Sequence, residues 1–420
     1  MRMESFALPA PWPNSSGLRI AGVRAIVTAP EGHPLVVVRV DTSDSGLYGL
    51  GCATFTQRFS AVVDVVDNYL APLLAGRDPA DIDDLGALIR FSSYWREGPV
   101  LNSALSGVDQ ALWDIAGKRA GMPVHELAGG RQRAAVPVYE HAAGRTPDEV
   151  AERVGELVAD GATAVRIQAS SVGLGHYGAP GLPATRTTDP FPQGWDVEEY
   201  LAGVPPLFAA VREAVGPTVR LLHDAHSRLT PRQALGLAHA IAEYQPYFLE
   251  DPIPPELYDR LPEVRAASPV PIAVGELLTS STEAARLVST QAVDFLRLHV
   301  SAVGGFSTAR RLSTLCEFAG VSTAWHGPAD VSPIGVAANT ALSLTTSAFG
   351  IQEAHRFPDA ALEVFPGALL VQAGHLRANQ APGWGIDLDE HKAAAFPPGR
   401  HRHDRWASTV RRPDGSLSAP

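Results

Sequence analysis

The first part of the chain alternates short apolar runs with turn signals and then becomes helical. Apolar residues dominate 24–28 and 35–40, and a turn signal, Asp-Ser-Gly, follows at 44–46. This pattern predicts a group of strands. Between 101 and 118 the apolar residues recur at three- and four-residue spacings, which is typical of an amphipathic helix. Strands followed by helices indicate an α+β domain at the N-terminal end.

After Gly130 the rhythm changes to eight short apolar runs that alternate with helical patterns, and each run ends on a polar residue. These residues are His141, Gln168, Asp224, Glu250, Glu276, His299 (with Arg297 just before it), His326 and Glu353. Asp224, Glu250 and Glu276 follow one another at 26-residue intervals. A strand, a helix and two loops take about that length, so the pattern predicts a (β/α)8 barrel whose site lies at the C-terminal ends of its strands.

One interval between the predicted strands is much longer than the others. Between Gln168 and Asp224 the chain is rich in Gly, Pro and Thr. Long loops of this kind are usually functional, and we expect a lid over the site. We therefore expect three parts. They are an α+β capping domain at 1–134 that contributes to substrate specificity, the barrel at 135–356, and a segment at 357–420 that packs back on the capping domain.

Composition and charge narrow the class of protein. The chain has 420 residues and a net charge of −11, and no Lys/Arg-rich run offsets this charge, which argues against a nucleic-acid partner. It has no apolar run long enough to span a bilayer, and its first residues do not resemble a secretion signal. Two cysteines, Cys52 and Cys316, suit a reducing compartment. We expect a cytoplasmic protein without a membrane partner.

Three of the strand-end residues are carboxylates on consecutive units of the predicted barrel. Adjacent strands lie about 5 Å apart, so oxygens of Asp224, Glu250 and Glu276 can converge on one hard cation. A single acidic residue at a strand end often only caps the next helix. Three in consecutive units, each after an apolar run, favour a metal site, and we expect one Mg²⁺ per subunit.

The residues around these carboxylates resemble a known family. The order His223-Asp224-Ala225-His226, then Leu-Glu-Asp-Pro at 249–252, then Val-Gly-Glu at 274–276, is similar to the metal-ligand series of the enolase superfamily. The closer similarity is to its mannonate dehydratase group, also called the galactonate dehydratase family, which includes starvation-sensing-protein homologues. The resemblance covers about 18–389. Further motifs that carry it are SSYWREGPV from Ser92, ALWDIAGK from Ala111, VYEHAAGR from Val138 and WHGPADVSP from Trp325.

The resemblance implies removal of the proton next to a substrate carboxylate that Mg²⁺ binds. Many superfamily members use Lys-x-Lys on the second barrel strand as a base, but this strand reads Arg166-Ile167-Gln168. In the mannonate dehydratase group the base is a lid tyrosine paired with that arginine, which matches Tyr177 and Arg166. A guanidinium favours the phenolate, so the pairing is chemically reasonable. The group's matching histidine implies that His226 protonates the departing 3-hydroxyl.

The group's polyol-binding positions are also matched. They correspond to His141, Glu276, Arg297, His326, Asp330 and Glu353, and in the N-terminal loop to Thr56. Three features depart from the group. Thr56 stands where Asn is usual, Pro328 follows His326-Gly327, and the last residues lack the Trp-rich tail. All three concern substrate contacts, so they leave the reaction class unchanged and put mannonate itself in doubt.

The interpretation favoured by these residues is a Mg²⁺-dependent dehydratase of an acid sugar such as D-mannonate or D-gluconate, giving a 2-keto-3-deoxy acid. The expected assembly is a homo-oligomer. Two alternatives remain open. One is a carboxylate epimerase, which usually needs two opposed bases, so the missing lysines count against it. The other is a catalytically idle homologue that binds an acid sugar in a sensing role, against which the intact catalytic residues argue.

Overall fold

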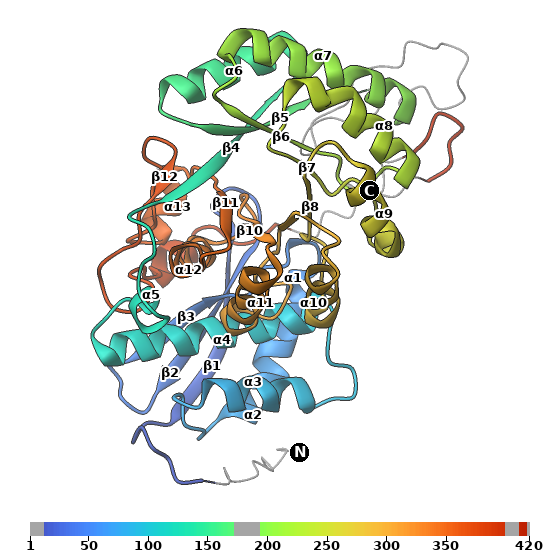
Figure 1. Ribbon diagram of the computed structural model, residues 1–420. Helices are drawn as coiled ribbons and strands as arrows, with labels where there is room; N and C mark the ends of the chain where they lie inside the picture. Colours follow the sequence, from blue (N-terminus) through green and yellow to red (C-terminus); the bar gives the residue numbers. More distant parts are fainter. Residues whose placement is uncertain (1–11, 172–193, 400–410, 418–420) are drawn as a thin grey trace.

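The computed structural model describes residues 12–171, 194–399 and 411–417. Its N-terminal part holds a three-stranded antiparallel sheet, β1 (Ile20–Thr28), β2 (Leu35–Thr42) and β3 (Tyr48–Cys52), in the order β1-β2-β3. The helices that follow are η1 (Thr56–Arg58), α1 (Phe59–Asp64), η2 (Val65–Leu70), α2 (Ala71–Leu74), α3 (Ile82–Phe91), α4 (Pro99–Ala120) and α5 (Val124–Leu127). The expected N-terminal α+β architecture is present (Figure 1).

The long helix α4 packs directly on this sheet, and two glycines of β3 explain how closely. A Cβ on Gly49 would collide with the carbonyl oxygen of Ala111, and one on Gly51 with the carbonyl oxygen of Gly107. Side chains at these two positions would therefore push the helix off the strand. Helix α4 begins with Pro99 in its first turn and ends at Gly121, whose φ of 68° is favourable for glycine.

Eight parallel strands form the second part of the structure and close on themselves. They are β4 (Val136–Gly144), β5 (Ala164–Ala169), β6 (Arg220–Asp224), β7 (Phe248–Glu250), β8 (Ile272–Val274), β9 (Phe295–Leu296), β10 (Ser322–Trp325) and β11 (Phe349–Glu353). Each pairs in parallel with the next, and β11 pairs with β4. The predicted eight-stranded barrel with an N-terminal capping domain is confirmed.

Helices surround the barrel and apolar side chains fill it. The helices are α6 (Pro147–Ala159), α7 (Val197–Val215), α8 (Pro231–Ile241), η4 (Ala242–Tyr244), η5 (Pro255–Arg260), α9 (Leu261–Ala267), α10 (Ser281–Ser289), α11 (Phe306–Ala319) and α12 (Pro333–Thr345). Inside, one side chain from each strand joins a buried cluster. Its members are Tyr139, Ala164, Leu222, Phe248, Ala273, Phe295, Ala324 and Ile351. The barrel is therefore a packed core, and room for a ligand exists only at its ends.

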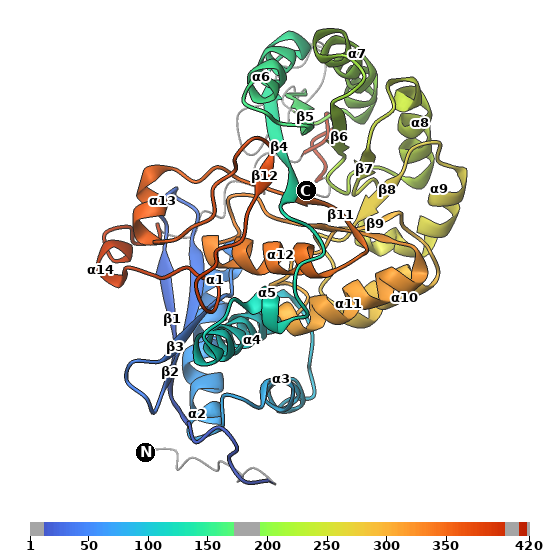
Figure 2. The same ribbon diagram turned by 60° about the vertical axis from the view of Figure 1, so that its left-hand side comes forward.

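The C-terminal part of the chain contacts both the barrel and the N-terminal sheet. It contains α13 (Asp359–Val364), β12 (His375–Leu376) and α14 (Glu390–Ala393), and β12 pairs antiparallel with β4. Figure 2 shows α14 beside β1, where Glu390 pairs with Arg24 at 2.6 Å. The backbone N–H of Trp384 donates to Asp114 of α4 at 2.9 Å. The domain boundaries at 134/135 and 356/357 stay predictions.

Two further features bear on the class of protein. In the part of the chain that the structure describes, every helix is too short or too polar to cross a bilayer. Cys52 and Cys316 are both buried as free thiols.

Candidate active site

Three carboxylates meet at the C-terminal ends of β6, β7 and β8. Asp224 and Glu250 end their strands and are register partners, whereas Glu276 lies two residues beyond β8. Their oxygens lie within 4.8 Å of one another, and Asp224 and Glu250 are fully buried. The close spacing follows from the parallel pairing of adjacent strands, so the geometry expected from the sequence is present.

The donor set suits a divalent cation of the Mg²⁺ type. Such ions prefer carboxylate oxygens and keep positions open for water or a ligand. Oε2 of Glu250 is buried and finds no hydrogen-bond partner among the described residues. Burial, together with the neighbouring Asp224, raises the pKa of Glu250 well above its usual range, although Arg297 lowers it. A cation at this point would give the unpartnered oxygen a ligand and relieve the repulsion between the carboxylates.

Two buried arginines lie behind the carboxylates. Nε of Arg297 is 2.6 Å from Oε1 of Glu250, and its Nη1 is 3.0 Å from Oε2 of Glu276. The same guanidinium pairs with Glu353. Nη1 of Arg166 lies 3.0 Å from Oδ2 of Asp224. These cations balance much of the negative charge that the strand ends bring together.

His226 lies beside Asp224 just after β6. Its φ of 49° is in the left-handed region, which allows its backbone N–H to donate to Oδ1 of Asp224 at 2.7 Å. Its ring Nε2 is 2.9 Å from Oδ2 of the same residue. Burial would raise the pKa of Asp224, but His226 and Arg166 lower it below its usual range. An imidazole is therefore held within reach of any ligand that the carboxylates bind.

The opposite side of the barrel mouth carries histidines and carboxylates from β4, β10 and β11. Nε2 of His141 is 2.7 Å from Oε1 of Glu353. Burial and the nearby Arg166 lower the pKa of His141 to about 4, so its imidazole is neutral at pH 7. His326 lies 3.3 Å from both Glu276 and Asp330. Against the effect of burial, hydrogen bonds to Asp330 and Glu276 raise the pKa of His326 to about 10. This half of the mouth therefore offers both neutral and charged donors and acceptors of the kind that bind hydroxyl groups.

The structure brings most of the predicted site residues together. Around the barrel axis, the metal-site carboxylates contact Arg166, His226 and Arg297. Through Glu276 and Arg297 they connect to a second group, made up of His141, His326, Asp330 and Glu353. Thr56 is in η1, where its hydroxyl bonds to Oε1 of Gln57 at 3.1 Å. Tyr177 and the expected lid lie outside the described residues.

Some residues of the site were given no role by the sequence. Tyr139 accepts a hydrogen bond from Nε of Arg297 at 3.0 Å, Gln168 bonds to His226, and the His299 ring stacks on His326 with 4.8 Å between the ring centroids. Each lies two positions from a predicted site residue of the same strand or strand end: Tyr139 from His141, Gln168 from Arg166 and His299 from Arg297. Alternation along a strand places such pairs on one face and could have found them.

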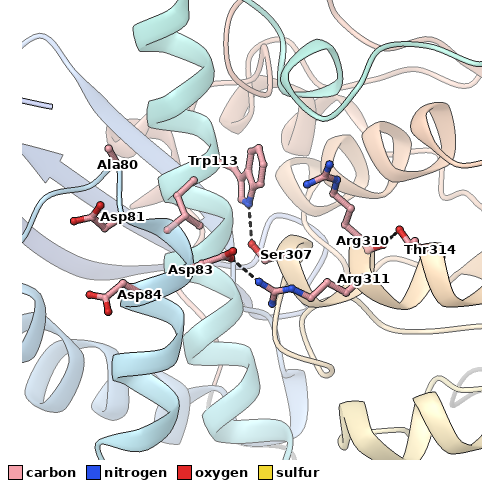
Figure 3. Close-up of a pocket in the computed structure, with 10 residues that line it drawn as sticks. Ala80, Asp81, Asp83, Asp84, Trp113, Ser307, Arg310, Arg311 and Thr314 are labelled. Atoms are coloured by element: carbon pink, nitrogen blue, oxygen red, sulfur yellow. Dashed lines mark hydrogen bonds and ion pairs between the residues drawn. The ribbon is translucent and has the colours of Figure 1, made fainter. Parts of the chain in front are cut away.

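A separate cavity of about 600 Å³ lies away from the strand ends, between α3, α4 and α11. Figure 3 shows Trp113 donating to Ser307, and Arg311 reaching Asp83 across the cavity. Among the described residues that line it, none belongs to the barrel mouth. Asp83 and Arg311 of its walls pair with each other, so it is a different kind of surface from the carboxylate cluster.

Comparison with known proteins agrees with this architecture. Residues 16–129 match the family model described as mandelate racemase / muconate lactonizing enzyme, N-terminal domain, and residues 149–392 match the model described as enolase C-terminal domain-like. Residues 130–148, which include β4, lie between the two matched ranges. Together they cover the N-terminal sheet and helices, most of the barrel and part of the C-terminal segment.

Similar proteins extend over nearly the whole chain. A D-galactonate dehydratase family member from Catenulispora acidiphila is 61% identical over 99% of this chain and 98% of its own. The crystal structure of an enolase from Pantoea ananatis, with bound D-gluconate and Mg, is 43% identical with a TM-score of 0.90, over 96% of this chain and 100% of that one. An Agrobacterium radiobacter enolase with bound Na and L-malate is 27% identical with a TM-score of 0.82, over 96% and 100% of the two chains. The chain therefore belongs to the enolase superfamily and, within it, to the D-galactonate dehydratase family.

Proposed function

We propose that this protein is a Mg²⁺-dependent dehydratase that converts an acid sugar, D-gluconate or D-mannonate, into a 2-keto-3-deoxy acid. The observation that carries the proposal is the cluster of Asp224, Glu250 and Glu276 with His226 beside it. A cation site next to an imidazole suits removal of a proton and loss of a hydroxyl on neighbouring carbons. The D-gluconate and Mg in the Pantoea ananatis enolase support this substrate class and this metal.

Asp224, Glu250 and Glu276 would hold one Mg²⁺ per subunit. The bound ion supplies positive charge beside the substrate carboxylate and so makes the neighbouring C2 proton more acidic. The burial of Asp224 and Glu250 keeps water away from their carboxylates, which strengthens the electrostatic interactions there.

Side chains of the protein would carry out the two proton transfers. We propose that Tyr177, as a phenolate favoured by the charge of Arg166, takes the C2 proton. His226 then protonates the 3-hydroxyl as the C3–O bond breaks and water leaves. The product is an enol, which becomes the 2-keto-3-deoxy acid when C3 gains a proton. The C2–H and C3–O bonds break, and no oxidant or reductant is needed.

The other side of the mouth would hold the sugar hydroxyls. We propose that His141, His326, Asp330 and Glu353 contact the substrate, with Thr56 contributing from the N-terminal domain. The side chain of Arg297 is fully buried. It would therefore act on the substrate indirectly, through the residues that it contacts. Glu276, partly exposed at 18%, would serve both the cation and the substrate.

The test is turnover of an acid-sugar library with Mg²⁺, followed by a chemical assay for 2-keto acids. D-Gluconate and D-mannonate differ only at C2 and lose that difference on dehydration, so both should give one product. We expect product from at least one of them and none after chelation of the metal. Binding of an acid sugar without any keto acid would indicate a sensing homologue, and inversion at C2 without water loss would indicate an epimerase.

A further inference from the structure

Gln168 lies near the C-terminal end of β5. It lies two residues after Arg166, so both side chains face the barrel interior. Its Nε2 is 3.0 Å from Nδ1 of His226. Its Oε1 is buried and has no hydrogen-bond partner within the described part of the chain. The main contact of this amide is therefore the histidine.

The direction of this hydrogen bond specifies where the imidazole carries its proton. An amide nitrogen can only donate, so Nδ1 of His226 must accept with its lone pair. The proton of the neutral ring is then on Nε2, which is the atom 2.9 Å from Oδ2 of Asp224. Gln168 thus presents the protonated nitrogen of His226 toward the carboxylate cluster.

The backbone of His226 alone does not fix its ring. The residue follows the last residue of β6 by two positions and has left-handed φ, and its side chain is 17% exposed. The contact of Nε2 with Asp224 holds one edge of the ring, and the amide of Gln168 holds the other edge at Nδ1.

We propose that Gln168 is a positioning residue that fixes the orientation and tautomer of His226 by donating to Nδ1. This inference rests on the proposed function, since His226 delivers its proton in that reaction. Gln168 itself does not contact the reacting atoms in this scheme. It acts on the second step, protonation of the leaving hydroxyl, and leaves removal of the C2 proton unaffected.

The first experiment compares Gln168→Met with Gln233→Met in the Mg²⁺-loaded protein. Gln233 belongs to the capping box of α8, away from His226, and serves as the matched control. We expect Gln168→Met to lower kcat for dehydration by about 10- to 100-fold. KM, Mg²⁺ affinity and C2 proton exchange with D₂O should stay at wild-type values. An unchanged kcat, or a raised KM with unchanged kcat, would overturn the proposal.

A second variant tests the direction of the hydrogen bond. In Gln168→Glu the side chain keeps its shape, but an ionised carboxylate can only accept. It would favour a proton on Nδ1 and should not restore kcat. Wild-type kcat in Gln168→Glu together with a loss in Gln168→Met would mean that the amide accepts, and the assignment of the proton to Nε2 would be wrong.

A third measurement does not depend on turnover. The ¹⁵N chemical shifts of the His226 ring, assigned by comparison with His226→Asn, report which nitrogen carries the proton. We expect a bare Nδ1 in the wild type and a mixture of the two tautomers in Gln168→Met. The same tautomer in both proteins would overturn the positioning role. If no acid sugar is turned over, the proposed function fails, and this arm still decides the role of Gln168.

Discussion

Asp224 and Glu250 are register partners on adjacent strands, yet their pKa values shift in opposite directions. Both are fully buried, so burial disfavours the charge on each. Asp224 has His226 and Arg166 against it, and contact with His226 and the charge of Arg166 lower its pKa. For Glu250, burial and the charge on Asp224 outweigh Arg297 and raise it. In the absence of a cation, Glu250 therefore holds a proton more readily than Asp224.

This asymmetry leads to a prediction for Glu250→Gln. A carboxyl whose pKa is raised by folding costs stability as pH rises, so the metal-free protein should not lose stability when the amide replaces it. Binding of Mg²⁺ should raise Tm in the wild type, because the cation binds the folded protein and not the unfolded chain, and this rise should disappear in the variant. Turnover should disappear with it. Calorimetric scans with and without Mg²⁺ provide the measurement.

Glu263→Gln is the control for this prediction, because Glu263 pairs with Arg260 on the surface. Its Mg²⁺-dependent rise in Tm should equal that of the wild type. An equal rise in Glu250→Gln would remove Glu250 from the cation site.

Replacing each of the two proposed proton-transfer residues should affect C2 proton exchange and dehydration differently. Tyr177→Phe removes the base, so C2 exchange with D₂O and dehydration should both fall to background. His226→Asn removes the acid, so dehydration should fall steeply, by about 100-fold or more, while C2 exchange survives. The measurement is NMR of the substrate in D₂O beside the keto-acid assay. Exchange that is retained in Tyr177→Phe and lost in His226→Asn would reverse the two roles.

The positions of individual site residues could be predicted where the barrel repeat determines them. Their contacts with residues distant in the sequence could not. The 26-residue spacing located Asp224, Glu250 and Glu276 because each unit repeats the same strand and loop lengths. The same pattern could not show that Arg297 pairs with Glu250 and Glu353 at once. Those contacts depend on side-chain conformations across the barrel, which no local pattern encodes.

At the scale of elements, α4 and β3 can lie in contact because two positions of β3 are glycines, which have no side chain. Gly51 faces the backbone of α4 at Gly107, where the carbonyl oxygen occupies the space of a Cβ. The backbone at both positions is held by the hydrogen bonds of its strand or helix, so it cannot shift locally to make room for a side chain. The sequence predicted the helix over 101–118 and the structure has it at Pro99–Ala120. The glycine contact could not be predicted, because it depends on the distance between two elements.

Gly51→Ala should therefore lower the free energy of unfolding by about 3 kcal/mol, the upper end of the usual cost of overpacking. Gly86→Ala is a matched control, since Gly86 lies inside α3 with no atom within 4 Å of the added methyl group. That change should raise the free energy of unfolding by about 0.5–1 kcal/mol through helix propensity. Urea unfolding of both variants measures the difference. Equal stability of the two would contradict the close contact.

For the molecule as a whole, buried neutral histidines should set the response to acid. Burial lowers the pKa of His223 and of His299 to about 4, with His226 and His326 nearby adding to the effect. Nδ1 of His223 donates to the carbonyl of Ile167, and Nε2 accepts from the hydroxyl of Tyr200, so a second ring proton would break the hydrogen bond from Tyr200. The unfolded chain takes up these protons near pH 6.5 and the folded chain only near pH 4.

The contribution of these two histidines to stability should thus be complete above about pH 6.5 and be lost as pH decreases toward 4, by about 3 kcal/mol for each. Urea unfolding at a series of pH values measures this slope. His223→Asn should reduce the slope by about one proton, whereas His391→Asn, a change at an exposed position, should leave it unchanged. An identical slope in His223→Asn would show that His223 does not contribute.

The barrel's closure has a consequence for the synthesis of the chain. Strand β4 pairs with β11 through Val138 and Gln352 and with β12 through Pro137 and His375. More than 200 residues separate these partners. At a translation rate of about 5–20 residues per second, one edge of β4 waits on the order of 10–40 s for its neighbour. An open strand edge invites pairing with other chains. In the cell, the time before β11 and β12 leave the ribosome is therefore when a nascent chain is most exposed to aggregation and most in need of a chaperone.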